Sequence, residues 1–310
     1  MSITWHTTIM SLKYCPICQS NITKLSYSAK HKKIKNANNQ IKASATETKG
    51  RNIYRCMKCE VFFCHPLPSQ DDLMLEYDSS NDEAFVSQNL YRFKTFDYHF
   101  KKLIRELNLN VGKIFITDIG AASGVFLKVA NNLGVQGRGF EANKWLVDYG
   151  RENYQADLVQ GGLRNFIPSE NKLDIVAFWD VIEHLSEPLE ELSYLSRQLK
   201  PKSIIIISLP STDSKSFKLL KWHWPMHLNV HLFYYNEKSL NYLLTSCGFK
   251  MIHKAKYEQK LSLGYLIFRV IKILVPKTKD SSVKFFTDSF LNRISIKYSI
   301  GQRIYVFEKI

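Results

Sequence analysis

The stretch Lys113–Leu127 constrains the fold most, because it predicts a buried strand, a glycine turn and a helix in direct succession. The apolar run Ile114–Ile119 has the length and composition of a strand. Gly120 and Gly124 follow it, and after them apolar residues recur at helical spacing. Such a turn brings bare backbone close to a ligand, and the helix N-terminus offers unpaired N–H groups. In an open α/β sheet, a nucleotide-like cofactor lies just past the carboxyl end of such a strand.

Two acidic residues indicate which cofactor this turn suits. A dinucleotide-binding turn has the pattern G-x-G-x-x-G, with its acid about 20 residues further on. Here the glycines are spaced G-x-x-x-G, and Asp118 stands two residues before the first of them. Its carboxylate would repel a pyrophosphate and attract an ammonium group, and S-adenosylmethionine carries an ammonium and a sulfonium but no phosphate. Glu141 ends a second short strand, 23 residues after Asp118, where a carboxylate can accept from both hydroxyls of a ribose.

Four segments together resemble the class I S-adenosylmethionine-dependent methyltransferases of types 11 and 23. They are, in order, 118–124, 139–141, 174–184 and 247–249, and the resemblance covers roughly residues 107–249. It implies an α/β fold with a Rossmann-like, seven-stranded sheet flanked by helices, spanning residues 111–310. It also implies transfer of a methyl group from S-adenosylmethionine by a one-step, in-line displacement, which needs mainly alignment and desolvation.

The resemblance assigns the cofactor contacts to the ends of successive strands. The expected cofactor-binding residues are Asp118, Gly120, Ala121, Gly124, Glu141, Ala142, Gly162, Leu163, Asp180 and Val181. The family often has an acid after the third strand that meets the adenine amino group. This chain has Gly162 and Leu163 there, so backbone groups and an apolar contact would hold the adenine. Asp180 ends the fourth strand and would border the amino-acid end of the cofactor.

The catalytic candidate is His184, which follows the fourth strand by a few residues. It would act as a general base for the acceptor, or else pack or cap the helix that follows. Glu183 beside it would be a metal ligand, a partner of such a ligand, or the group that orients His184. A loop rich in tryptophan and histidine, Lys221–His231, would form the acceptor pocket. Its three histidines do not have the spacing of a known zinc motif.

The cysteines predict a separate small module over residues 1–68. Two C-x-x-C pairs hold four of the six cysteines, and such pairs let all four thiolates face one tetrahedral Zn²⁺: Cys15, Cys18, Cys56 and Cys59. The 37 residues between the pairs are long for a zinc ribbon and include a polar, lysine-rich stretch, Lys30–Lys49, that predicts a loop. Cys64 and His65 offer a substitute ligand, although a buried thiol and a surface imidazole explain them better. Four thiolates leave no open position, so the metal would be structural.

Two further segments are predicted to be helical. Residues 69–110, with Asp71–Tyr77 as a first helix, would pack over the sheet edge or form a lid on the cofactor. A second helix, near 261–275, would be inserted before the last strand. It is apolar with interspersed Arg269 and Lys272, so it would pack against the domain or lie on a membrane surface as a cationic helix.

The net charge of +15 raises the question of nucleic-acid binding. The excess lies on the flanks: +6 over residues 1–110, +1 over 111–250 and +8 over 251–310. Because no interleaved basic and aromatic motif accompanies it, solvated surface lysines explain it better. The alternative function is an RNA- or protein-binding, methyltransferase-like module that uses the zinc ribbon and the basic flanks.

Location and acceptor follow from weaker signals. Met1–Leu12 lacks the pattern of a signal peptide, and no stretch reaches 18 uncharged apolar residues, so we expect a cytoplasmic protein, peripheral at the inner membrane face if the inserted helix binds lipid. The chain resembles zinc-ribbon methyltransferases of similar layout, which are often linked to the modification of sugars in surface polysaccharide or secondary metabolite pathways. The resemblance therefore implies a small-molecule or glycan acceptor, methylated at oxygen or carbon.

Overall fold

The computed structural model describes residues 14–28, 51–69, 83–228, 230–275, 282, 285–286 and 288–310. The predicted loop Lys30–Lys49 and the predicted helix Asp71–Tyr77 lie outside the described residues, as does Met1–Leu12.

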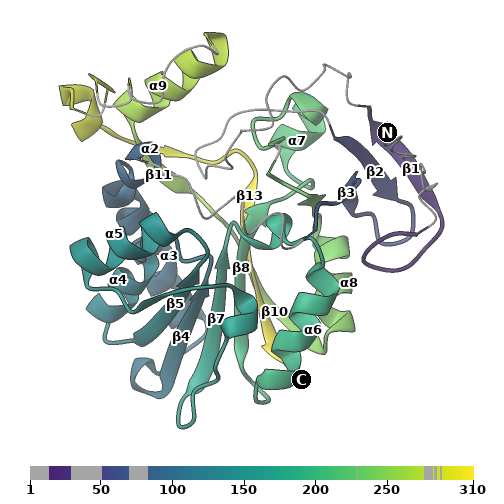
Figure 1. The fold of residues 1–310 in the computed structure, drawn as a ribbon, viewed down its shortest axis with the longest axis horizontal. Helices are drawn as coiled ribbons and strands as arrows, with labels where there is room; N and C mark the ends of the chain where they lie inside the picture. The colour runs from purple at the N-terminus through teal and green to yellow at the C-terminus, as the bar shows by residue number, and fades with distance from the viewer. Residues whose placement is uncertain are drawn as a thin grey trace, which may run out of the picture.

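A seven-stranded sheet forms the centre of the molecule (Figure 1). Its strands are β4 (Ile114–Ile119), β5 (Gln136–Glu141), β6 (Leu158–Gln160), β7 (Leu173–Trp179), β8 (Ile204–Pro210), β10 (Phe249–Lys256) and β13 (Gln302–Lys309). Their order in space is β10-β13-β8-β7-β4-β5-β6. β13 runs antiparallel to both of its neighbours, and the other paired strands are parallel. The predicted α/β class with a Rossmann-like, seven-stranded sheet is confirmed.

Helices cover both faces of this sheet (Figure 1). One face carries α3 (Asn89–Glu106), α4 (Val125–Asn132) and α5 (Lys144–Tyr154), and the other carries α6 (Pro188–Gln198) and α8 (Glu237–Ser246). From Ile175 to Trp179, strand β7 is apolar without alternation because both of its faces are covered. Ile175 and Ala177 pack into the first layer, whereas Val176 and Phe178 pack into the second. A parallel strand buried on both faces needs apolar residues at every position.

Shorter helical elements lie along the chain between these parts. They are α2 (Glu83–Val86), η1 (Val111–Lys113), η2 (Leu163–Asn165), η3 (Ile182–His184), α7 (Lys215–Leu220) and η4 (Lys221–His223).

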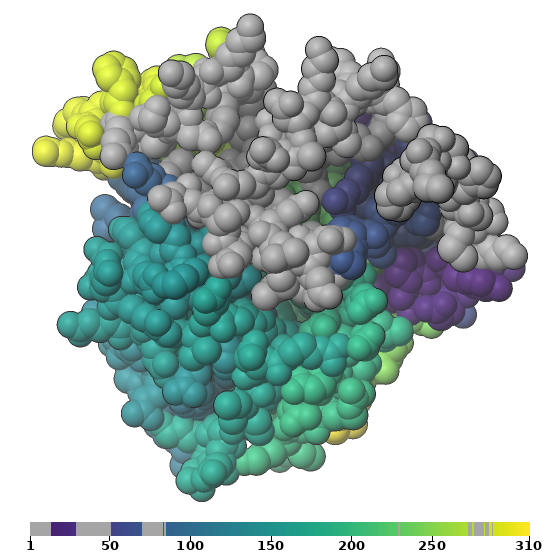
Figure 2. All heavy atoms as spheres, in the orientation of Figure 1, coloured from purple at the N-terminus to yellow at the C-terminus, as the bar shows by residue number. Residues whose placement is uncertain are grey.

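A second sheet joins the N-terminal residues to the rest of the chain. It contains β1 (Thr23–Tyr27), β2 (Asn52–Cys56), β3 (Phe62–His65) and β9 (Phe233–Tyr234), in that order and all antiparallel. β9 comes from the middle of the chain, and Phe63 of β3 shares one apolar core with Leu232 and Phe233. Figure 2 shows the purple N-terminal residues against the green surface of the larger domain. The sheet therefore crosses the boundary that the sequence places after residue 68.

An insertion lies between β10 and β13. It contains β11 (Gln259–Ser262), α9 (Leu263–Leu274), η6 (Phe290–Arg293) and β12 (Ser295–Tyr298), and β11 pairs with β12 in antiparallel register. Helix α9 stands at a corner of the molecule, away from the main sheet (Figure 1). Tyr265 and Phe268 are buried against Phe286, whereas Val270 is exposed. Among the described helices, none has the length and apolar composition needed to cross a membrane.

Candidate functional site

The turn after β4 requires glycine at two positions. Gly120 has φ +67°, and a Cβ added to it would lie 2.7 Å from Cγ2 of Val181, which follows the neighbouring strand β7. Gly124 has φ +73° at the start of α4, and its added Cβ would lie 2.7 Å from the Cβ of Ala156. Left-handed backbone and close packing both exclude larger side chains here. The turn therefore holds bare backbone at the carboxyl edge of the sheet, between β4 and β7, as the sequence predicts.

Asp118 and Glu141 lie on the paired strands β4 and β5. Asp118 is 2% exposed, and among the described residues its Oδ1 has no hydrogen-bond partner. Burial, followed by repulsion from Glu141, raises the pKa of Asp118 well above its usual value. The two carboxylate oxygens of Glu141 accept from the backbone N–H groups of Ala122 and Asn143, at 2.8 Å each. Burial raises the pKa of Glu141, although these hydrogen bonds oppose the shift.

These carboxylates fit the cofactor that the sequence predicts. A buried carboxylate oxygen without a donor is costly, and a bound ammonium group would satisfy it. Glu141 keeps lone pairs for ribose hydroxyls, because each of its oxygens accepts one hydrogen bond and can accept two. The assignment of both residues to S-adenosylmethionine stays a prediction.

Asn89, at the start of α3, was not predicted as a site residue. Its side-chain amide donates to Oγ of Ser123 at 3.0 Å and to the hydroxyl of Tyr154 at 3.1 Å. Ser123 belongs to the glycine turn, and both Asn89 and Ser123 are buried. Through this hydrogen bond, α3 restrains the glycine turn. A sequence separation of 34 residues between these partners gives no local pattern from which to predict the contact.

The residues predicted to hold adenine lie at the ends of β5 and β6. Leu163 is buried in the core, and the N–H of Gly162 donates to Oδ1 of Asn165 at 2.9 Å. The carbonyl of Ala142 accepts from the side chain of Gln160 at 3.3 Å. These positions share the carboxyl edge of the sheet with Asp118. Their contact with adenine stays a prediction.

Asp180, directly after β7, has φ +56° and is held by three donors. The hydroxyl of Ser208 donates to its Oδ1 at 2.9 Å, and the amides of Gln302 and Gln259 donate to its Oδ2 at 2.9 and 3.3 Å. Burial outweighs these hydrogen bonds and raises the pKa of Asp180 to about 6. Gln259 and Gln302 come from β11 and β13, so Asp180 ties the insertion to the edge of the sheet. The sequence gives no signal for this pairing.

Glu183, His184 and His231 form a cluster at the same edge. One ligand atom from each lies within 4.8 Å of the others, and Nε2 of His231 is 4.0 Å from Oε1 of Glu183. Burial raises the pKa of Glu183 well above its usual value and lowers that of His184 to about 4. The role of His184 as a general base stays a prediction, whereas its contact with a histidine of the 221–231 loop is an observation: the two imidazole centroids are 4.9 Å apart.

Trp222, Trp224 and His227 of that loop pack against other segments, mainly the N-terminal sheet. The indole N–H of Trp222 donates to the carbonyl of Ser26 at 3.1 Å, and its ring packs edge-on against Phe62. Trp224 is buried and donates to the carbonyl of Ile300 at 2.7 Å. His227 packs against Tyr27. From the described residues of this loop, His231 lies beside Glu183, whereas Trp222, Trp224 and His227 pack against other segments. An acceptor pocket formed by this loop stays a prediction.

The four cysteines of the two C-x-x-C pairs converge, buried, within 4.8 Å of one another. Sγ of Cys15 and Cys59 are 3.7 Å apart, and those of Cys18 and Cys56 are 3.4 Å apart. Thiolates bound to one tetrahedral Zn²⁺ lie roughly 3.8 Å apart, so the site fits the ion. Backbone N–H groups two residues after Cys15 and Cys56 point at their sulfurs at 3.4 Å, which stabilises thiolate. The hydrogen bond with Cys59 lowers the pKa of Cys15 to about 5.

Cys64 lies outside this cluster. It is a buried thiol whose Sγ–H donates to the carbonyl of His231 at 3.4 Å, and burial raises its pKa to about 12.

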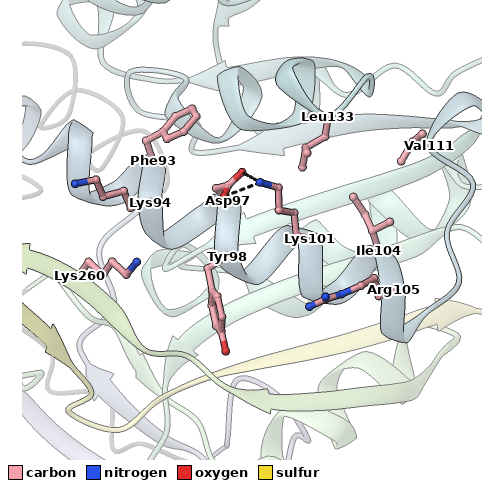
Figure 3. A pocket seen from close by; sticks show the side chains of 10 residues that line it. All are labelled: Phe93, Lys94, Asp97, Tyr98, Lys101, Ile104, Arg105, Val111, Leu133 and Lys260. Carbon is pink, nitrogen blue, oxygen red and sulfur yellow. Dashed lines mark hydrogen bonds and ion pairs between the residues drawn. The ribbon is translucent and has the colours of Figure 1, made fainter.

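A surface hollow lies elsewhere. It has a volume of about 560 Å³ and lies along α3, lined by Phe93, Lys94, Asp97, Tyr98, Lys101, Ile104, Arg105, Val111, Leu133 and Lys260. Figure 3 shows Asp97 and Lys101 paired along its wall. Val111 precedes β4, so the hollow extends toward the amino edge of the sheet. It is distinct from the carboxyl edge where the predicted site residues gather.

Comparison with solved structures finds similar chains at low identity. A possible histamine N-methyltransferase from Thermotoga maritima is 14% identical, with a TM-score of 0.45, and the alignment covers 74% of this chain and 94% of that one. Magnesium protoporphyrin IX methyltransferase from Synechocystis, with bound SAH, is 14% identical, with a TM-score of 0.46 and coverage of 75% and 90%. A SAM-dependent methyltransferase from Archaeoglobus fulgidus is 19% identical, with a TM-score of 0.46 and coverage of 74% and 100%. A comparison with curated proteins finds no match.

The family model of the methyltransferase domain matches residues 94–254, which is more than half of the chain. The match begins within α3 and ends within β10, so it contains the glycine turn, Glu141 and the cluster of Glu183, His184 and His231. The chain therefore belongs to the methyltransferase domain family.

Proposed function

We propose that this protein transfers a methyl group from S-adenosylmethionine to an oxygen or carbon atom of a small-molecule or glycan acceptor. The observation that carries the cofactor assignment is the buried Oδ1 of Asp118, which lacks a donor among the described residues beside the turn of Gly120. A cofactor with an ammonium group and no phosphate suits that arrangement.

The chain's own contribution is binding, alignment and exclusion of water. When bound, S-adenosylmethionine supplies an electrophilic methyl group on its sulfonium. Asp118 would hold the ammonium group and Glu141 the ribose hydroxyls, while Asn89 fixes the turn through Ser123. Alignment at a buried edge accounts for most of what such a displacement requires.

The proposed role of zinc is structural. Four thiolates complete a tetrahedral site and leave no position for substrate. The ion would hold the knuckle between β2 and β3 to the one before β1. Because β3 pairs with β9, which follows His231 by two residues, this also fixes one wall of the site.

The choice of a small-molecule or glycan acceptor rests on the resemblance and on charge. The segment 111–250, which contains the site residues, has a net charge of +1, which offers little attraction to a polyanion. Binding of RNA or protein through the ribbon and the basic flanks remains the alternative. A steep fall in RNA affinity with salt would support it.

Calorimetry with S-adenosylmethionine tests the cofactor assignment. Asp118→Asn should weaken binding at least about tenfold, since it removes a charged partner. The matched control is Asp174→Asn. Asp174 is also buried on a strand with one oxygen unpaired among the described residues, but it lies near the amino end of β7. Equal affinity of Asp118→Asn and the parent protein would overturn the placement.

A further inference from the structure

Glu183 has no role in the cofactor site described above, yet its environment is unusual. It is 2% exposed, and neither carboxylate oxygen meets a hydrogen-bond donor in the part of the chain that the structure describes. Its backbone is fixed, because its carbonyl accepts from the N–H of Leu232 at 2.8 Å. A buried carboxylate is retained when it is paired or coordinates a metal. The groups nearest to it in the cluster are two histidines, so the question is whether those histidines are arranged to share a ligand.

Both imidazoles are oriented by backbone carbonyls. Nδ1 of His184 is 2.8 Å from the carbonyl of Val230, and Nδ1 of His231 is 2.9 Å from the carbonyl of Met226. A carbonyl can only accept, so Nδ1 of His231 carries the proton and its Nε2 carries the lone pair. His184 also lies against a second backbone carbonyl, that of Asp180. Metal-binding histidines in proteins are fixed in this manner, by a hydrogen bond from the nitrogen that does not bind the metal.

The spacing is close to that of a coordination sphere. One ligand atom from each of the three residues lies within 4.8 Å of the others, and the pair between Glu183 and His231 is at 4.0 Å. Nitrogen and oxygen ligands about 2.1 Å from one ion lie roughly 3.0–3.5 Å apart. A shift of about an ångström would therefore close the cluster on a cation, which would satisfy the oxygens of Glu183.

We propose that Glu183, His184 and His231 bind a divalent cation of the Mn²⁺, Fe²⁺ or Zn²⁺ type, separate from the four-cysteine site. Two imidazoles and a carboxylate suit these ions, whereas Mg²⁺ and Ca²⁺ prefer oxygen ligands throughout. Three protein ligands leave open positions, which is the arrangement of catalytic rather than structural sites. Glu183 and His231 are buried and His184 is half-buried, so the open positions would face the side of His184.

The location of the cluster indicates a catalytic role for the ion, an inference that rests on the proposed function. The cluster follows β7 at the carboxyl edge, and Val181, two residues before Glu183, packs against Gly120 of the cofactor turn. A cation there would bind the oxygen of an acceptor hydroxyl and lower its pKa, as it does for bound water. The O–H bond breaks and the proton passes to solvent. The oxygen then forms its bond to the methyl carbon while the carbon–sulfur bond breaks. The electron pair of the broken bond stays on sulfur. The proposal therefore favours a hydroxyl as the acceptor group.

Binding of Mn²⁺ tests the site without any acceptor. The probe is Mn²⁺ added to full-length protein whose cysteines are loaded with zinc, and bound metal is counted from the loss of the aqueous Mn²⁺ paramagnetic signal. Thiolates prefer softer ions, so the four-cysteine site does not compete for Mn²⁺. The parent protein should bind one Mn²⁺ per chain and melt at a higher temperature in its presence. Glu183→Gln and His231→Gln should each raise the Kd for Mn²⁺ at least about tenfold and abolish the thermal shift.

His227→Gln is the matched control. His227 lies in the same loop and is also buried, and its Nδ1 donates to the carbonyl of Trp222 at 2.9 Å, but it lies outside the cluster. It should bind Mn²⁺ like the parent. Without metal, Glu183→Gln should melt no lower than the parent, because it replaces a buried carboxyl group whose oxygens meet no donor among the described residues. Lost binding would then not reflect unfolding.

The outcomes separate this inference from the proposed function. A parent that binds S-adenosylmethionine but no Mn²⁺, or a Glu183→Gln protein that binds Mn²⁺ with unchanged affinity, would overturn the metal site alone. Failure to bind S-adenosylmethionine, with Mn²⁺ still bound, would overturn the proposed function instead.

Discussion

The backbone N–H of Leu232 donates to the carbonyl of Glu183 at 2.8 Å, and the carbonyl of Leu232 accepts from the N–H of Cys64, also at 2.8 Å. One residue thus joins the loop after β7 to strand β3 of the N-terminal sheet. Because β3 pairs with β2, which ends at Cys56, the proposed zinc site and the candidate active site are linked through hydrogen-bonded backbone. Loss of zinc should therefore loosen the backbone near Glu183 as well as the first 68 residues.

Cys56→Ser tests this connection. It should abolish zinc binding, measured by elemental analysis, and loosen β2, β3 and β9, because β3 pairs with β9. Hydrogen exchange followed by mass spectrometry should show faster exchange at Leu232–Tyr235 as well as in residues 51–65. Methyl transfer, once an acceptor is known, should fall in parallel.

Cys247→Ser is the control, since Cys247 is buried between α6 and α8, near the carbonyl of Leu189 and the hydroxyl of Ser193. It should keep its zinc and its slow exchange. If Cys56→Ser loses zinc while exchange at Leu232–Tyr235 stays slow, the ribbon is an independent module, as the sequence alone suggested.

The affinity for S-adenosylmethionine should fall in a pH range above the one in which ordinary carboxylates gain a proton. Burial raises the pKa of both Asp118 and Glu141. As the pH falls through a raised pKa, the carboxylate gains a proton and no longer attracts the ammonium group, so affinity should fall. Calorimetry from pH 8 down to pH 5 should show this loss of affinity. In Asp118→Asn the affinity should depend less on pH, because the contribution of Asp118 is absent.

Without cofactor, the contribution of Asp118 to the stability of the fold should increase as the pH falls, whereas cofactor affinity decreases. Because the folded-state pKa of Asp118 exceeds its unfolded value, the folded state binds the proton more tightly, and this residue contributes stability as the pH falls and loses it as the pH rises. The difference in unfolding free energy between the parent and Asp118→Asn should therefore favour the variant more at pH 8 than at pH 5. A difference that is constant with pH would contradict the raised pKa.

The sequence predicts the main sheet well because each strand there carries its own signal. Ile114–Ile119 and the residues of β7 are mostly apolar, and the turn of Gly120 and Gly124 follows from local backbone geometry. The C-x-x-C pairs are equally local. Contacts between distant segments carry no such signal: Gln259 and Gln302 on Asp180, β9 beside β3, and His231 beside Glu183. Trp222 and Trp224 of the 221–231 loop pack against other segments, and the sequence could not foresee this, because aromatic side chains line binding sites and packing interfaces alike.

Gly120→Ala should destabilise the fold by about 1–3 kcal/mol, since φ of +67° and a contact at 2.7 Å with Val181 act together. Chemical denaturation measures the effect. Gly134→Ala isolates the backbone contribution, because Gly134 has φ +80° with no described atom within 4 Å of an added Cβ. It should cost about 1 kcal/mol. Combining Gly120→Ala with Val181→Ala removes the steric part. If the double variant is no more stable than the sum of the two single changes predicts, Val181 does not pack closely against Gly120.

Asn89 should affect cofactor binding although it belongs to the helix before the first strand of the main sheet. Its amide donates both to Ser123 in the turn and to Tyr154 at the end of α5, so two variants separate its roles. Tyr154→Phe removes the second contact and should lower stability with little effect on the affinity for S-adenosylmethionine. Asn89→Ala should lower both, because Ser123 loses its donor and the turn loses its restraint. In a double-mutant cycle, Asn89→Ala and Ser123→Ala should show a coupling of about 0.5–3 kcal/mol in cofactor affinity. Additive effects of the two changes, or an effect of Asn89→Ala matched by Tyr154→Phe, would mean that α3 only packs on the domain and does not order the turn.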